Sequence, residues 1–304
     1  FLKYMFQITK KEKKSFEYLE LYSACSKNKA KICLNNGGNL EELIVENCKI
    51  ITDLSPLKYQ QTYASSILFP FANRVKDGKF HFLEKNYTLD CNEVEANNAL
   101  HGLIYNKRFK LVDNEINSKY AKVLLSFEEK DPHSGFPFLY KIDLHYKLSM
   151  TILEIDIKIT NTGTEKFPFT LGWHPYFYTS NISKSKLRFK SVQKVKSDNR
   201  NITTKITDLK TPNPLDLHAI SLDDAFVLDT NKVEFETPAY KAKLSSSKSM
   251  NYLQLYTPNN SNAIAIEPMT GVSNSFNNRI GLKELSPKEN YTTKWQLKLL
   301  ILNN

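Results

Sequence analysis

This sequence of 304 residues has only four cysteines, no glycine-rich phosphate loop and no long apolar run. The cysteines, Cys25, Cys33, Cys48 and Cys91, form no Cys-x-x-Cys pair and have no histidine at a ligand spacing, which argues against a zinc site. No segment reaches the length needed to cross a bilayer, and the first residues lack the apolar core of a secretory signal. We therefore expect reduced thiols, no metal, no membrane partner and a cytoplasmic protein.

Acidic residues are also few relative to basic ones. The chain has 32 Asp and Glu against 42 Lys and Arg, which gives a net charge of +10 and a pI near 9.2. Such an excess can attract nucleic acid or a phosphorylated substrate, because long-range fields concentrate counter-ions. The lysines are scattered, however, and the one dense run, 10–14, lies near the N-terminus without any nucleic-acid motif. We expect solvated surface charge and no nucleic-acid partner.

No fixed-period repeat, low-complexity segment or Pro/Gly/Ser linker divides the chain. We therefore expect residues 1–304 to form one domain, within which Met5 is a candidate natural start and residues 1–4 an addition before it. Monomer and homodimer both remain open.

Alternation of apolar and polar residues, which is typical of half-buried strands, recurs along the chain. It predicts strands over 153–159 and 295–301, while 12–22 fits either a strand or a short helix. The Asp-Gly pair within 74–82 predicts a β-hairpin. Many short strands and no compelling long helix indicate an all-β sandwich or barrel.

Four separated segments carry residues suited to chemistry. Asn73 and Arg74 offer an amide and a rigid fork of donors, and His101 precedes a glycine that permits close backbone approach. His174 lies among aromatic residues, which pack well against the C–H faces of a sugar ring. Glu267 follows two alanines on the face of a short strand opposite two isoleucines, where a ligand could reach a carboxylate base. Taken alone, each residue is better explained as a structural or surface residue.

In succession, these segments resemble the aldose 1-epimerase, or galactose mutarotase, family. The elements are Phe-Ala-Asn-Arg-Val at 71–75, Asn-Ala-Leu-His-Gly at 98–102 and Gly-Trp-His-Pro-Tyr-Phe at 172–177, and the likeness runs from about residue 36 to the C-terminus. Their order and spacing are far more specific than any one element. The resemblance implies a large antiparallel β-sandwich, in agreement with the alternation.

The resemblance also implies roles for individual residues. Glu267 would be the general base at the anomeric hydroxyl and His174 the general acid at the ring oxygen, while His101 would bind and polarise the substrate. Arg74 and, more weakly, Asn73 would bind the sugar. A family aspartate maps to Asp223, with the adjacent Asp224 as the alternative, because the usual Asp-His pair is Asp-Asp here.

One base and one acid suffice for anomer exchange, so the expected enzyme needs no cofactor. In its productive form we expect an ionised Glu267 and a protonated His174, and hence a bell-shaped pH profile. Two alternatives stay open: a hexose-6-phosphate 1-epimerase, suggested by the positive charge, and a non-catalytic sugar-binding protein on the same fold. The sequence does not indicate which aldose is preferred.

Overall fold

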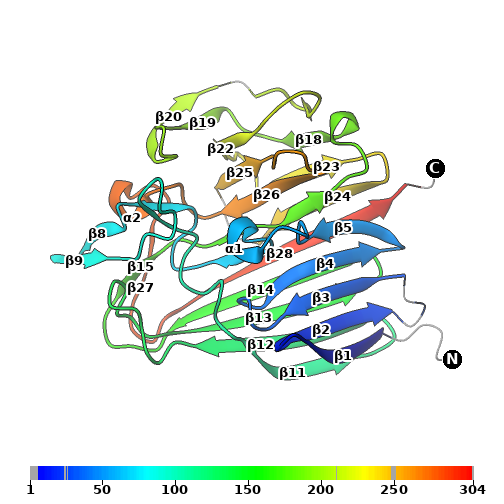
Figure 1. Cartoon of the computed structure of the whole chain (residues 1–304), viewed down its shortest axis with the longest axis horizontal. Helices are drawn as coiled ribbons and strands as arrows, with labels where there is room; N and C mark the ends of the chain where they lie inside the picture. The colour runs from blue at the N-terminus through cyan, green and yellow to red at the C-terminus, as the bar shows by residue number, and fades with distance from the viewer. Residues whose placement is uncertain (1–5, 24, 26, 210, 248–250, 303–304) are drawn as a thin grey trace.

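The structure is a computed structural model, and it describes residues 6–23, 25, 27–209, 211–247 and 251–302. The candidate start at Met5 lies outside these residues. Two large sheets dominate the fold (Figure 1). Every strand pair in the described ranges is antiparallel.

The larger sheet has 13 strands. In spatial order they are β1 (Phe6–Lys13), β2 (Phe16–Ser23), β3 (Lys29–Cys33), β4 (Asn39–Val45), β5 (Cys48–Thr52), β17 (Tyr176–Tyr178), β26 (Ala263–Met269), β25 (Tyr252–Tyr256), β22 (Asp223–Val227), β19 (Gln193–Ser197) and β20 (Thr203–Asp208), with β16 (Gly172–Trp173) joining β26 to β6 (Ile67–Leu68). The segment that fitted strand or helix is therefore strand, forming parts of β1 and β2.

The second sheet has nine strands. Their order is β11 (Lys110–Ile116), β12 (Tyr120–Glu128), β13 (Tyr140–Ser149), β14 (Ile152–Asn161), β28 (Asn290–Ile301), β24 (Tyr240–Ser246), β23 (Lys232–Glu236), β18 (Lys186–Phe189) and β21 (Leu215–Asp216). β14 and β28 contain the two strands predicted from alternation, and both predictions are confirmed.

Three two-stranded ladders and three short helical turns complete the described fold. They are β7 (Arg74–Lys76) with β10 (Asn98–Leu100), β8 (Lys79–Phe82) with β9 (Lys85–Thr88), β15 (Phe167–Phe169) with β27 (Lys283–Leu285), α1 (Tyr59–Thr62), α2 (Ser275–Asn278) and a 3-10 turn (Ile182–Lys184). None of the helices in the described part of the chain is long and apolar enough to cross a membrane.

The two large sheets face each other across an apolar core. In β14, alternate residues from Leu153 to Ile159 are buried, and burial of one such side chain stabilises the fold by roughly 1.5–3 kcal/mol. Trp173 of the larger sheet stacks on Trp295 of the smaller one, with ring centroids 5.8 Å apart and planes at 18°. The predicted fold class, an antiparallel β-sandwich, is confirmed.

The predicted hairpin over 74–82 is wrong in its pairing. Asp77 and Gly78 do form a turn with positive φ, but β7 pairs with β10 and β8 pairs with β9. Side-chain packing explains the choice of partner, because Phe80 of β8 stacks on Tyr87 of β9 at 4.9 Å. The Asp77-Gly78 pair therefore forms the predicted turn, while packing between side chains determines which strands pair on either side of it.

Candidate active site

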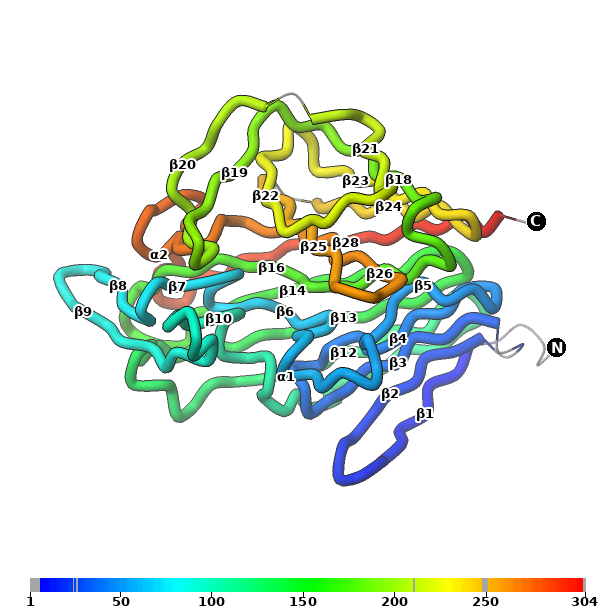
Figure 2. The backbone as a smooth tube through the Cα atoms, turned by 45° about the horizontal axis from the view of Figure 1, so that its top comes forward, coloured from blue at the N-terminus to red at the C-terminus, as the bar shows by residue number. Residues whose placement is uncertain are grey.

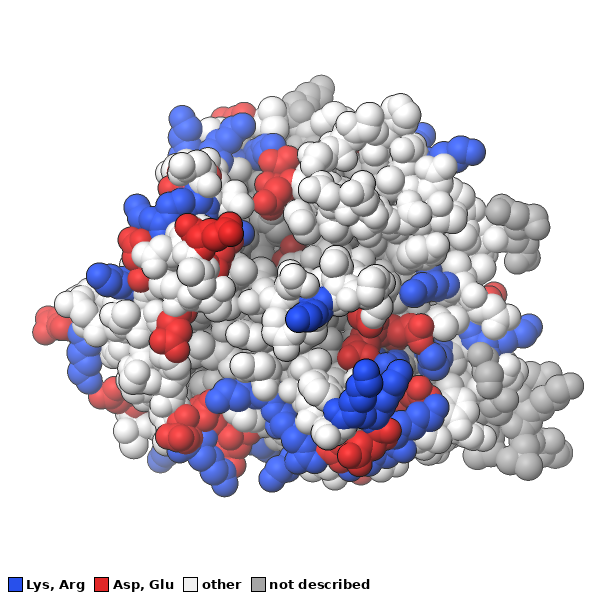
Figure 3. Space-filling view, viewed as in Figure 1, with Lys and Arg blue, Asp and Glu red and all other residues white. Residues whose placement is uncertain are grey.

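One cavity of about 270 Å³ brings together all six residues predicted to form the site. They come from separate parts of the sequence: Asn73, Arg74, His101, His174, Asp223 and Glu267. A hollow with acidic atoms inside it is visible near the middle of the face shown in Figure 3, where the surrounding charges of both signs are intermixed.

Strand β26 places Glu267 on the wall of this cavity. The strand alternates as the sequence predicts, with Ile264 and Ile266 in the main core and the alanines of the opposite face packed against Tyr176. Glu267 lies on this alanine face and is only 2% exposed. The small side chains beside it leave room for a ligand at the carboxyl group.

Backbone hydrogen bonds hold His174 in the wall of the cavity. Its N–H donates to the Ser66 carbonyl at 3.0 Å, and its carbonyl accepts from the Ser65 N–H at 2.7 Å. The imidazole Nε2 lies 3.5 Å from Glu267 Oε1, and the side chains of both residues are almost fully buried. The structure thus places the expected acid and base side by side.

Burial controls the protonation of this pair. It raises the pKa of Glu267 well above its ordinary value, an effect to which the nearby Asp223 carboxylate adds. It also lowers the pKa of His174 to about 4. Burial therefore favours a neutral imidazole at His174 and shifts Glu267 toward its neutral carboxylic acid. The ion pair expected from the sequence is the tautomer of that neutral pair and carries the same number of protons.

His101 approaches the pair from the loop after β10. Its backbone is left-handed (φ 64°), and a Cβ added to the following Gly102 would lie 2.3 Å from the Phe69 carbonyl oxygen, so only glycine fits there. The His101 ring lies edge-on to the His174 ring at 5.0 Å and to the Tyr63 ring at 4.9 Å. This geometry explains the Leu-His-Gly element.

His101 and His174 share an electrostatic environment that favours neutral rings. Burial, followed by the nearby His174 and Arg74, lowers the pKa of His101 well below its ordinary value. The Nδ1 atoms of both rings are buried and have no hydrogen-bond partner among the described residues. These two atoms are thus exceptions to the rule that buried polar groups in proteins are nearly always paired.

Arg74 lines the cavity, but much of its guanidinium is already engaged. Its Nε and one terminal nitrogen donate to the Glu93 carboxylate at 2.7–3.1 Å, and the other terminal nitrogen donates to Asn73 Oδ1 at 3.0 Å. Burial alone would raise the pKa of Glu93, but hydrogen bonds from Arg74 and Asn98 hold that pKa below its usual value. Arg74 is thus held in place, with its remaining N–H groups available to a sugar.

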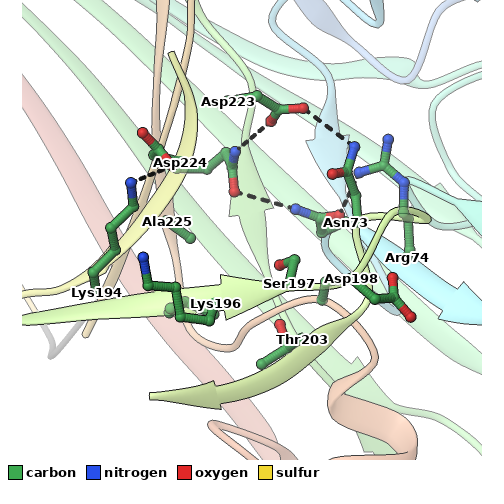
Figure 4. Close-up of a pocket in the computed structure, with 14 residues that line it drawn as sticks. Asn73, Arg74, Lys194, Lys196, Ser197, Asp198, Thr203, Asp223, Asp224 and Ala225 are labelled. Carbon is green, nitrogen blue, oxygen red and sulfur yellow. Dashed lines mark hydrogen bonds and ion pairs between the residues drawn. The ribbon is translucent and has the colours of Figure 1, made fainter. Parts of the chain in front are cut away.

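Between the two candidate aspartates, the geometry favours Asp223. Asp223 lines the catalytic cavity, and its two oxygens accept from Gln254 Nε2 at 2.8 Å and Asn201 Nδ2 at 3.2 Å. The Asp224 carboxylate instead pairs with Lys194 at 2.5 Å (Figure 4), and Asp224 does not line the catalytic cavity. Gln254 also accepts from Asn73 Nδ2 at 3.4 Å, which links the strand β25 to the Arg74 segment.

Arg200, at the tip of the β19–β20 hairpin, closes this network. Its guanidinium donates to the Ala96 and Asn97 carbonyls, to Asp77 and to Asn98 Oδ1, all at 2.8–3.0 Å. Figure 2 shows the hairpin tip reaching the β7–β10 region. Asn98 in turn donates to Glu93 at 2.8 Å, and Asn201, the next residue after Arg200 in the chain, donates to Asp223. Hydrogen bonds, together with the peptide link between Arg200 and Asn201, therefore connect these residues in a ring around the rim. We call this set of residues the polar ring: Asn73, Arg74, Glu93, Asn98, Arg200, Asn201, Asp223 and Gln254.

Several lining residues escaped prediction, among them Tyr63, Glu93, Gln254 and Tyr256. Gln254 had one sequence signal, since it is the lone amide within the apolar run Tyr-Leu-Gln-Leu-Tyr of β25. No group of three or more His, Cys, Asp or Glu residues within the described ranges is arranged to hold a metal ion.

Comparison with known proteins gives the family. The model of the aldose 1-epimerase family matches residues 21–298. The chain belongs to this family.

Individual relatives agree with this assignment. The uncharacterized protein YihR of Escherichia coli (strain K12) is 25% identical over 259 residues, which are 81% of this chain and 82% of YihR. A galactose mutarotase-like protein from Clostridium acetobutylicum superposes with a TM-score of 0.86 at 22% identity, covering 98% of this chain and 99% of its own. Galactose 1-epimerase from Lactobacillus acidophilus NCFM superposes with a TM-score of 0.80 at 17% identity, covering 98% of this chain and 99% of its own. At these identities the structural likeness shows a shared fold.

Proposed function

We propose that this protein is an aldose 1-epimerase that interconverts the α and β anomers of a free aldose. The observation that carries the proposal is the buried His174–Glu267 pair, 3.5 Å apart, on the wall of a cavity that also holds Arg74 and Asp223. Family membership supports the same activity.

The reaction needs two proton transfers and no net change in protons. The Glu267 carboxylate accepts the proton of the anomeric hydroxyl while the His174 imidazolium donates a proton to the ring oxygen, the bond between C1 and the ring oxygen breaks, and the open-chain aldehyde forms. Rotation about C1–C2 and reversal of both transfers produce the other anomer. A positioned acid and base contribute on the order of 10² to 10⁴-fold each to such a rate.

The pKa shifts of Glu267 and His174 fit one half of this cycle. Ring opening leaves Glu267 protonated and His174 neutral, which is the form that burial favours. Ring opening itself requires the ion-pair tautomer, as expected from the sequence, and the hydroxyl groups of a bound sugar can stabilise that charge separation by hydrogen bonding. His101, held neutral by burial, is suited to hydrogen-bond the sugar beside His174.

The two alternatives receive less support. A hexose-6-phosphate needs cationic partners, but the guanidinium of Arg74 is already bound by Glu93, and none of the lysines that the structure describes lines the catalytic cavity. A non-catalytic binding protein has no need for a buried acid–base pair, whereas strongly shifted pKa values cluster at catalytic sites.

The direct test follows fresh α-D-glucose and α-D-galactose by polarimetry or NMR, with and without the protein, and compares each with its 6-phosphate. We expect the free sugars to reach anomeric equilibrium faster in the presence of the protein. Acceleration confined to the phosphorylated sugars would replace the proposal with its phosphate alternative. Binding of the free sugar without acceleration would replace it with the non-catalytic alternative.

A further inference from the structure

The segment that precedes the strand β10 contains Asn92, an exposed residue whose side-chain amide is bonded through both its oxygen and its nitrogen. Its Oδ1 accepts from the Leu100 N–H at 2.7 Å, and its Nδ2 donates to the Leu100 carbonyl and to the Tyr63 hydroxyl, each at 3.0 Å. An exposed amide ordinarily bonds to water, because holding it in one geometry costs side-chain entropy. Asn92 instead ties the end of β10 to the end of α1.

Both of these chain ends carry residues of the catalytic cavity. Leu100 is the last residue of β10 and directly precedes His101, and Tyr63 directly follows α1. All three line the cavity, and the Tyr63 ring lies edge-on to the His101 ring at 4.9 Å. One amide therefore holds the backbone next to His101 and also the aromatic ring that packs against its imidazole.

The backbone conformation at both rings requires such restraint. Tyr63 and His101 have left-handed φ angles of 49° and 64°. Residues other than glycine adopt this region only where the surrounding structure holds them there. On the β7 side, the His101 N–H donates to the Asn73 carbonyl at 2.9 Å. On the other edge of β10, the Asn92 amide pairs with both backbone groups of Leu100, as a neighbouring strand would.

The next residue, Glu93, acts on Arg74 from the same edge of β10. Its backbone exchanges two hydrogen bonds with Asn98, at 3.1 and 3.2 Å, and its carboxylate holds the Arg74 guanidinium. Two consecutive side chains thus reach two different groups of the site. Because Glu93 fixes Arg74, the equivalent target of Asn92 is His101.

We propose that Asn92 is a positioning residue for His101, which it holds through Leu100 and Tyr63 at the place where the imidazole meets a bound sugar. Asn92 itself does not line the catalytic cavity, so its substitution removes no contact with the sugar. The effect on turnover rests on the proposed function, whereas the effect on the His101 ring does not.

The kinetic test is a double-mutant cycle between Asn92→Ala and His101→Asn, with fresh α-D-glucose followed by polarimetry. We expect Asn92→Ala to lower kcat/KM about 10-fold in the wild-type protein but no more than about twofold in His101→Asn, because its effect passes through the imidazole. Asn86→Ala is the matched control, since Asn86 is an exposed amide that bonds to His81 and does not line the cavity. It should leave kcat/KM unchanged. An equal loss in both backgrounds would show a general structural role and overturn the proposal.

The histidine ring signals give a second readout that needs no activity. In proton–nitrogen NMR spectra, with His101 assigned by the signals missing from His101→Asn, we expect Asn92→Ala to shift or broaden the His101 ring signals. The ring signals of His145, on the strand β13, should stay in place and show that the variant folds. Unchanged His101 signals would overturn the proposal. If the wild-type protein does not accelerate glucose, the proposed function fails, and the ring signals alone decide whether Asn92 positions His101.

Discussion

The two ends of the catalytic cavity are built on opposite principles. At one end, His101 and His174 are buried with unpartnered Nδ1 atoms, and burial shifts the pKa values of both histidines and of Glu267. At the other end, the polar ring links each of its side chains to a neighbour. The contrast teaches that each reactive histidine keeps one ring nitrogen without a partner among the described residues, while the groups that shape the site are held by hydrogen bonds.

The largest effect is expected from breaking the reactive end. Glu267→Gln keeps the size of the side chain but cannot accept the proton of the anomeric hydroxyl. We expect kcat to fall by about 10² to 10⁴-fold in polarimetry, with a much smaller change in KM. Full mutarotation by this variant would show that Glu267 is not the base.

At the partnered end, Arg74→Lys should act on binding. Lysine lacks the planar fork that holds Glu93, so both the ring and the contact with the sugar are weakened. We expect KM to rise about 10- to 100-fold while kcat falls less. Arg108→Lys, which alters the exposed pair with Glu17, is the matched control and should leave both constants unchanged. A fall in kcat alone would place Arg74 in the chemical step.

The reactive end should also make stability depend on pH. Folding depresses the pKa values of His101 and His174, so their contribution to stability is present above about pH 6.5, the unfolded value. It is lost as the pH falls through the folded pKa values, which for His174 is about 4. Glu267, whose pKa is raised, contributes in the opposite direction, present below its unfolded pKa and lost as the pH rises through its folded one. On acidification the two histidines therefore lower the stability, and Glu267 opposes that loss.

This balance can be measured by urea unfolding at pH 6.5, 5.5 and 4.5. In His101→Asn, where asparagine tolerates the left-handed backbone, the loss of stability due to one of the two histidines is removed. We expect the stability of the variant to fall less steeply than that of wild type, by about 1.4 kcal/mol per pH unit. If the free energy of unfolding changed equally with pH in the variant and in wild type, His101 would have the same pKa in the folded and unfolded chains.

The smallest effect is expected at the tip of the β19–β20 hairpin. Arg200→Ala removes four hydrogen bonds that hold the tip against the β7–β10 region, and Asn201 then no longer holds Asp223 as firmly. We expect KM for a free aldose to rise severalfold with little change in kcat. Arg188→Ala on the strand β18, whose guanidinium pairs with Glu236, is the control. A fall in kcat as large as in Glu267→Gln would contradict a positioning role.

The same contrast explains what the sequence predicted. Strong alternation identified β14 and β28, and the ordered motifs brought six residues to one cavity. Glu93 and Asn201 escaped because their importance arises from contacts between distant segments, which no local pattern encodes. The wrong pairing at Asp77-Gly78 has the same origin, since a turn signal specifies a reversal but not the strand that packs beside it. Protonation of the acid–base pair likewise depends on burial, which is a property of the assembled fold.

The stacked indoles of Trp173 and Trp295 have an optical consequence. They are the two tryptophans of the chain, one in each large sheet, and Trp173 immediately precedes His174. All indole fluorescence therefore originates at the interface of the sandwich, next to the acid–base pair. Separation of the sheets must alter the emission spectrum and the near-ultraviolet circular dichroism together, so the protein carries an intrinsic probe of its core that requires no label.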